Sequence, residues 1–195
     1  MPPKARISRE MITDAAVEAV RRGGTDSITA RTVAGILGCS TQPVMYHFPT
    51  VEELRKEAYA RADVMHTEYL LRTVPDRDPL LCIGLNYIRF ADEEPSIFRF
   101  LFQSEYSEKR DLEGLLSSGE LRPVLSAVEE GLGEAGDRAK EIFLTLAMTV
   151  HGFASLVANG MLEYDEKNAE ALLERTFEAT LDASAEEDKN ESDNP

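Results

Sequence analysis

Apolar residues recur every three or four positions along most of the chain, the spacing that places them on one face of an α-helix. The first such stripe consists of Met11, Ile12, Ala15, Ala16, Ala19 and Val20. Ser8 stands before it and Gly23-Gly24 follows it. Because serine accepts bonds from the free amides of a helix start and glycine readily ends helices, the pattern predicts a first helix between these residues.

Two short helices and one long helix follow by the same criteria. Their N-terminal caps are Thr29 for the second helix, Ser40 or Thr41 for the third, and Thr50 for the fourth. Gly38 closes the second helix. A Glu three residues after Thr50 completes a capping box, which is typical of a helix start.

The rest of the chain shows further helical stretches separated by proline, glycine or polar breaks. These stretches cover roughly residues 79–93, 95–104, 120–132, 137–162 and 166–182. No window shows the sustained alternation that predicts a strand. The fold is therefore predicted to be all-α, with about nine helices.

Charge divides the 195 residues into three parts. The whole chain carries a net charge of −15, yet residues 1–50 carry +2 and residues 183–195 carry −4. An acidic excess argues against non-specific binding to nucleic acid or membrane, but this argument does not apply to residues 1–50, whose net charge is positive. We expect a head at 1–50, a helical body at 51–182 and an acidic, disordered tail at 183–195.

Targeting and membrane signals are weak. The N-terminus lacks the apolar stretch of a signal peptide, and Cys39 and Cys82 are too few for a disulfide framework. Residues 142–162 contain no charged side chain, but Thr, His, Ser and Asn interrupt them. These interruptions favour a buried helix over a membrane span. A cytoplasmic protein without a membrane partner is expected.

Residues 29–48 predict a helix-turn-helix, the sharpest signal in the sequence. Two short helices are joined at Gly38, which can take the left-handed conformation that such a turn needs. The start of the third helix can then enter a DNA major groove, where Gln42 pairs with adenine edges and Thr41 or Pro43 contacts a thymine methyl group. Ser40 and Thr29, at the helix starts, suit phosphate contacts.

Over residues 7–60 the sequence resembles the tetracycline-repressor (TetR) family of transcriptional regulators. The resemblance rests on Ile28-Thr29, Val33-Ala34, Gly38-Cys39-Ser40, His47-Phe48 and Glu52-Glu53-Leu54, in addition to the capped first helix. It implies a three-helix DNA-binding domain followed by a larger helical domain for ligand binding and dimerisation. It also implies a double-stranded DNA operator whose binding depends on an unidentified small effector.

The resemblance also implies roles for individual residues. Thr29 and Arg31 contact DNA from the second helix, Thr41, Gln42 and Pro43 contact base edges, and Tyr46 and His47 contact the DNA backbone. Two positions depart from the family pattern: its usual Tyr is Met45 here, and its usual Lys at the start of the fourth helix is Val51. Binding of the DNA backbone is then expected to depend more on Tyr46, His47 and the basic arm residues Lys4, Arg6 and Arg9. Alternatively, Tyr46 packs on the first helix and His47 is a plain surface residue.

The body offers candidate residues for a dimer interface and an effector pocket. The last two helices are the expected two-fold interface, because small residues on the first of them allow close approach. The interface candidates are Phe153, Leu156, Val157, Leu172, Leu173, Phe177 and Leu181. The pocket candidates are Phe90, Phe98, Phe102, Met148 and His151, for each of which an ordinary core position is the alternative.

An enzyme is the main rival class. The glycine string at 131–136 resembles a dinucleotide-binding loop, but no strand precedes it. Neither a nucleophile elbow nor a P-loop is present, and three His and two Cys show no metal-ligand spacing. We therefore expect no enzyme activity, no cofactor and no metal. A helical adaptor, or a small-molecule-binding protein that does not bind DNA, is the alternative.

Overall fold

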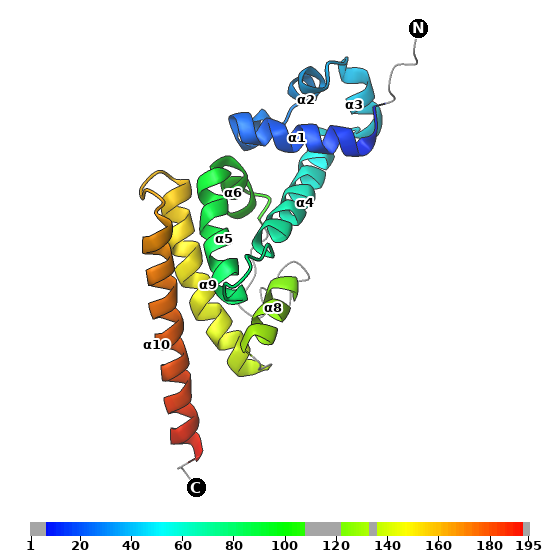
Figure 1. Cartoon of the computed structure of the whole chain (residues 1–195). Helices are drawn as coiled ribbons and strands as arrows, with labels where there is room; N and C mark the ends of the chain where they lie inside the picture. Colours follow the sequence, from blue (N-terminus) through cyan, green and yellow to red (C-terminus); the bar gives the residue numbers. More distant parts are fainter. Residues whose placement is uncertain (1–6, 108–121, 133–135, 193–195) are drawn as a thin grey trace. The chain divides into compact units, whose positions relative to one another are not determined.

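The computed structural model describes residues 7–107, 122–132 and 136–192, and these are helical nearly throughout (Figure 1). Nine α-helices and one short 3-10 helix occur in these ranges, without a strand, which confirms the all-α prediction there. By contacts the chain forms two compact units. One comprises residues 1–66 and 94–108, and the other comprises residues 67–93 and 109–195.

The first unit contains the predicted head and more. Its helices are α1 (Arg9–Gly23), η1 (Thr25–Ser27), α2 (Ala30–Leu37), α3 (Thr41–His47), most of α4 (Val51–Leu70) and α6 (Pro95–Phe102). Two of the expected caps form, since Ser8 Oγ accepts from Met11 N at 3.2 Å and Thr50 Oγ1 accepts from Glu53 N at 3.2 Å. Ser40 precedes α3 as expected but makes no side-chain capping bond. Side chains from α1, α2, α4 and α6 fill the core, with Ile12, Val20, Val33 and Phe98 fully buried.

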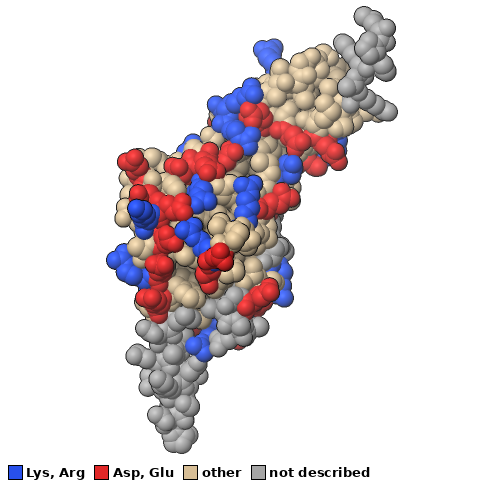
Figure 2. Space-filling view, in the orientation of Figure 1, with Lys and Arg blue, Asp and Glu red and all other residues tan. Residues whose placement is uncertain are grey.

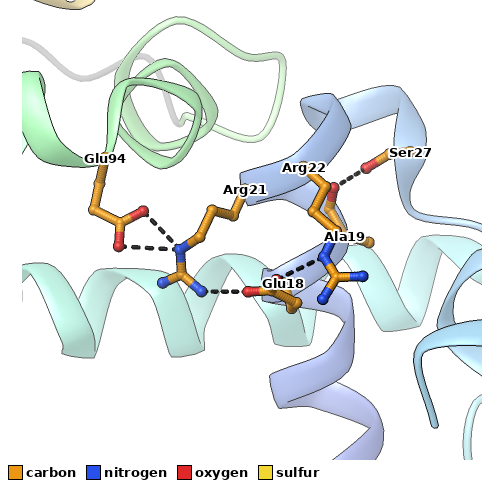
Figure 3. A network of polar contacts seen from close by, with 6 residues as sticks. All are labelled: Glu18, Ala19, Arg21, Arg22, Ser27 and Glu94. Carbon is orange, nitrogen blue, oxygen red and sulfur yellow. Dashed lines mark hydrogen bonds and ion pairs between the residues drawn. The ribbon is translucent and has the colours of Figure 1, made fainter.

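Helix α6 joins this unit because it packs against α1. Figure 3 shows the polar contacts that accompany this packing. Arg21 Nε lies 2.8 and 3.0 Å from the two carboxylate oxygens of Glu94, the residue directly before α6. The same guanidinium also pairs with Glu18, which in turn accepts from Arg22 at 2.7 Å. The boundaries of the two contact units thus differ from the expected boundary at residue 50. The expected division into a DNA-binding head and an effector-binding body stays a prediction.

The second unit is a helical layer built around α5 (Pro79–Glu93). This helix packs against α9 (Asp137–Ala158) and α10 (Glu166–Ser192), and α9 and α10 lie side by side (Figure 1). α8 (Arg122–Leu132) contacts α5 and α9. Leu70, Leu125 and Phe143 form a buried apolar cluster among these helices.

Several helix ends differ from expectation. α9 ends at Ala158 rather than 162, because Asn159 caps it and Gly160 takes the left-handed φ of 67°. α10 continues to Ser192, although we expected disorder from residue 183. The added residues include Ala183, Ala185 and Glu186, which are good helix formers despite the acidity of the segment. The expected break at 117–119 lies outside the described residues.

One described helix, α9, is long and apolar enough to cross a membrane by length and composition alone. Its first turn carries Asp137, Arg138 and Lys140, and Lys140 pairs with Asp137 at 2.8 Å. α5, α8 and α10 all pack against it. These contacts agree with the expectation that this segment is a buried helix of the domain core.

Candidate nucleic-acid interface

The turn between α2 and α3 has the geometry that the sequence predicts. Thr29 Oγ1 accepts from Thr32 N at 3.1 Å and so caps α2. Gly38 adopts the left-handed conformation (φ 64°, ψ 33°), and Cys39 N donates to Ala34 O at 3.0 Å. A side chain at Gly38 would be strained in this conformation, so the turn depends on glycine.

Helix α3 has one buried side and one open side. Val44 is 1% exposed and anchors the helix, and Phe48, directly after it, is also buried. Ser40, Thr41 and Gln42 are exposed at its N-terminal end. The open side therefore presents the residues predicted to read bases.

The other predicted DNA contacts are distributed around this open side. Thr29 and Arg31 are exposed, whereas Pro43 is half-buried. Tyr46 is 77% exposed, which contradicts the alternative that it packs on α1. Its ring instead meets the ring of His47 edge-on, with centroids 5.2 Å apart. Lys4 and Arg6 lie outside the described residues.

His47 and Arg9 both make contacts to other residues of the first unit. His47 Nε2 lies 3.2 Å from the carbonyl oxygen of Ile7. Arg9 donates to the carbonyl oxygen of His47 at 2.9 Å, pairs with Glu57 at 3.0 Å and lies over the ring of Phe48, 4.1 Å from its centroid. These contacts tie the start of α1 to the end of α3, and the one-dimensional charge pattern gave no signal for them.

The interface region carries little charge. Arg31 is the only charged residue between Ser27 and Thr50 in the sequence. On the face drawn in Figure 2, the surface over α2 and α3 is accordingly mostly uncharged, whereas acidic and basic side chains intermingle over the other helices. Such a surface favours recognition by shape and hydrogen bonds over attraction by net charge.

The predicted pocket residues are divided between the two units. Phe98 and Phe102 belong to the first unit, where their ring centroids are 4.8 Å apart. Phe90 belongs to the second unit and packs edge-on against Tyr69. Met148 is 53% exposed, on a face of α9 that is open to solvent. A pocket shared by all five residues stays a prediction.

His151, whose mid-helix position predicted a bond to a nearby hydroxyl as the alternative to a pocket role, contacts two hydroxyl groups in the second unit. Tyr87 Oη lies 2.8 Å from His151 Nδ1, and Ser155 Oγ lies 3.3 Å from His151 Nε2. Burial lowers the pKa of His151 below its ordinary 6.5 and raises the pKa of Tyr87 far above its ordinary value. Both side chains are therefore uncharged at neutral pH, and they present neutral hydrogen-bonding groups among apolar neighbours.

The predicted dimer residues divide into exposed and buried sets. Leu156 is 43% exposed, and Phe153, Leu172 and Phe177 are half-buried. Val157 and Leu173 are only 7% and 6% exposed, so they support the helix pair from within the protomer and leave little area for a second copy. The side chain of Leu181 lies outside the described residues.

A second group of contacts joins α5 and the loop before it to α10. Arg77 pairs with Glu166 at 3.0 Å and with Glu170 at 3.1 Å, and Arg89 pairs with Glu166 at 2.8 Å. The bonds from Arg77, and then from Arg89, lower the pKa of Glu166 below its ordinary 4.5. In the described ranges no group of three His, Cys, Asp or Glu side chains is placed to hold a metal ion.

Comparison with known proteins agrees with this architecture. Residues 80–180, just over half of the chain, match the family model described as the tetracyclin repressor-like C-terminal domain. Among solved structures, a TetR-family transcriptional regulator from Streptomyces coelicolor has a TM-score of 0.74 at 19% identity, covering 93% of this chain and 83% of that chain. A comparison with curated protein sequences gives no match.

Two further structures are similar at lower scores. A putative TetR-family regulator from Vibrio parahaemolyticus has a TM-score of 0.63 at 16% identity, covering 88% of this chain and 97% of that chain. The multidrug binding protein EbrR, complexed with ethidium, has a TM-score of 0.51 at 22% identity, covering 90% and 99%. At such identities these similarities show the shared fold.

Proposed function

Because the chain belongs to the TetR family of transcriptional regulators, we propose that it binds a palindromic DNA operator as a homodimer and that a small effector modulates this binding. The observation that carries the proposal is the capped α2–Gly38–α3 turn, whose open side presents Thr41, Gln42 and Tyr46. Repression of the target genes and a cytoplasmic location are parts of this proposal. The proposal includes no catalytic residue and no cofactor.

Base reading is assigned to the start of α3. The amide of Gln42 can bond both N6 and N7 of adenine in the major groove, and Thr41 and Pro43 can meet a thymine methyl group. Thr29, Arg31 and Ser40 are exposed beside them and suit the phosphates on either side. Tyr46, near the C-terminal end of α3, is a further candidate for a phosphate contact.

The distribution of charge supports specific rather than general DNA binding. The head has a net charge of +2, whereas the rest of the chain is strongly acidic. The acidic body repels DNA, and the weakly basic head adds little non-specific attraction. Affinity then depends on hydrogen bonds and shape at the operator.

Dimerisation is assigned to the open face of α9 together with α10. Thr145, Met148, Gly152 and Leu156 are all exposed and are spaced by three or four residues, so they form one stripe along α9. Met148 and Leu156 are large apolar side chains, and a two-fold packing of helices would remove them from contact with water. We therefore assign Met148 to the dimer face rather than to the pocket.

The effector site is assigned to the second unit, near Phe90, Tyr87 and His151. The uncharged Tyr87–His151 pair provides hydrogen bonds in an otherwise apolar environment, which suits a small molecule with an apolar body. EbrR, which shares the fold, has a structure in complex with ethidium. Phe98 and Phe102 belong to the first unit and are not part of this assignment.

A mobility-shift titration with DNA from the promoter of the protein's own gene tests the proposal. Gln42→Ala should weaken binding by about 5- to 150-fold per half-site, the range for loss of one bidentate base contact. Gln103→Ala is the matched control, because Gln103 is also an exposed glutamine of the first unit but lies outside α2 and α3. Equal affinities for the Gln42 variant, the control and the wild type would overturn the assignment.

A further inference from the structure

The open side of α3 contains an apolar side chain that has no part in the base reading proposed so far. Met45 is 41% exposed, although methionine is among the residue types most often buried. Its neighbour Val44, the other aliphatic residue of α3, is buried and anchors the helix. Met45 thus presents apolar surface on the element that is proposed to enter the major groove.

Helical spacing places Met45 between the two exposed residues that are proposed to read bases. Successive residues of an α-helix are separated by about 100° around its axis. Met45 is therefore about 40° from Thr41 and about 60° from Gln42, on the arc between them, and all three side chains are exposed. Pro43, by contrast, is half-buried and lies about 160° from Met45. Met45 consequently shares the open side of α3 with Thr41 and Gln42.

The chemistry of methionine limits what Met45 can contact on DNA. Its thioether has no N–H or O–H group, so it can donate no hydrogen bond to a phosphate oxygen or to a base. The apolar group that a base presents in the major groove is the C5 methyl group of thymine. Because methionine is unbranched and polarisable, the end of its side chain can adapt to the position of such a methyl group.

We propose that Met45 is a specificity-determining residue, which contacts the C5 methyl group of a thymine within two base pairs of the position read by Gln42. This inference rests on the proposed DNA binding. Met45 comes three residues after Gln42, a rise of about 4.5 Å along the helix axis, and successive base pairs are about 3.4 Å apart. The two side chains therefore reach the same base pair or neighbouring ones.

Removal of the thymine methyl group has an effect of predictable size. Burial of one such carbon contributes a factor of about four to affinity, and a palindromic operator contains the contact twice. Deoxyuridine differs from thymidine only by the missing C5 methyl group. Its introduction at both symmetric positions should therefore weaken wild-type binding about 15-fold.

The test is a uracil scan of a duplex that the full-length wild type selects from a random DNA pool, read by fluorescence anisotropy. Each symmetric pair of thymines is replaced in turn, and the position read by Gln42 is the one at which Gln42→Ala relaxes the base preference. We expect one thymine pair within two base pairs of that position to show the 15-fold loss.

The variants assign this loss to a side chain. Met45→Ala should bind the thymine and uracil duplexes with equal affinity, whereas Met45→Leu should keep much of the difference, because leucine is apolar and of similar volume. Met11→Ala is the matched control and should keep the full difference, since Met11 is 39% exposed in the same unit but belongs to α1. Thermal unfolding of each variant identifies any that do not fold.

The outcomes separate a methyl contact from a structural role and from the proposed function. If Met45 only supports α3, Met45→Ala lowers affinity for both duplexes by the same factor and the uracil effect persists, which overturns the proposal. It is also overturned if no thymine in the predicted range shows a uracil effect, or if the effect is lost in Thr41→Ser and not in Met45→Ala. Each of these results leaves Gln42-dependent binding intact, whereas failure of the wild type to select any DNA would overturn the proposed function.

Discussion

The open stripe of α9 gives a dimer prediction whose size follows from the structure. Met148 is 53% exposed and Leu156 is 43% exposed. Full burial of such a side chain contributes roughly 1.5–3 kcal/mol, so burying the remaining half contributes about 1 kcal/mol. In a two-fold dimer each side chain occurs twice, and the four together amount to about 4 kcal/mol.

Replacing both residues by alanine should therefore raise the dimer dissociation constant about a thousandfold. The protomer itself should keep its stability, because alanine is the best helix former and both side chains are exposed. Sedimentation velocity from nanomolar to micromolar concentration measures the shift. Val64→Ala is the control, since Val64 is 48% exposed but belongs to α4 and not to the stripe.

Two results would refute this reasoning. A double variant that dimerises as tightly as the wild type would show that the stripe is not the interface. A Val64 variant that dissociates equally would show that general surface hydrophobicity, and not this face, drives association.

Two further predictions concern the second unit. In a urea titration, Gly84→Ala should lower the free energy of unfolding by about 1 kcal/mol. The new Cβ would lie 2.9 Å from Leu173 Cδ1, and the cost of this overpacking exceeds the gain in helix propensity. Gly35→Ala is the control, because Gly35 has open space around it and its replacement should be neutral or stabilising. The folded-state pKa of Glu166 lies below its ordinary 4.5, so its two arginine partners stabilise the fold above that pH and lose this effect as the pH falls. The stability difference between wild type and Glu166→Gln should consequently shrink between pH 6 and pH 3.5, and a difference independent of pH would contradict the ion-pair explanation.

Local features of the fold could be predicted from the sequence. The caps at Ser8, Thr29 and Thr50 and the left-handed Gly38 depend on residues within a few positions of one another. α10 ends at Ser192 rather than near residue 182, and the added residues include alanine and glutamate, which favour helix.

Contacts between distant segments were beyond the sequence pattern. Nothing in the charge sequence indicates that Arg21 pairs with Glu94 or Arg9 with Glu57, since many acidic residues are equivalent partners until the fold selects one. Likewise, α9 is apolar on several sides, so the pattern could not decide which side faces solvent. Because Met148 is exposed, we assign it to the proposed dimer face rather than to the predicted pocket.

The central claim is that two copies of α3 read a palindromic operator. Selection of bound duplexes from a random DNA pool by the full-length protein tests it most directly. The account predicts enrichment of an inverted repeat, with half-sites one helical turn of about 10–10.5 base pairs apart or a multiple of it, and relaxed preference at one position of each half-site for Gln42→Ala. Recovery of a single unrepeated motif, or of no preferred sequence, would contradict it.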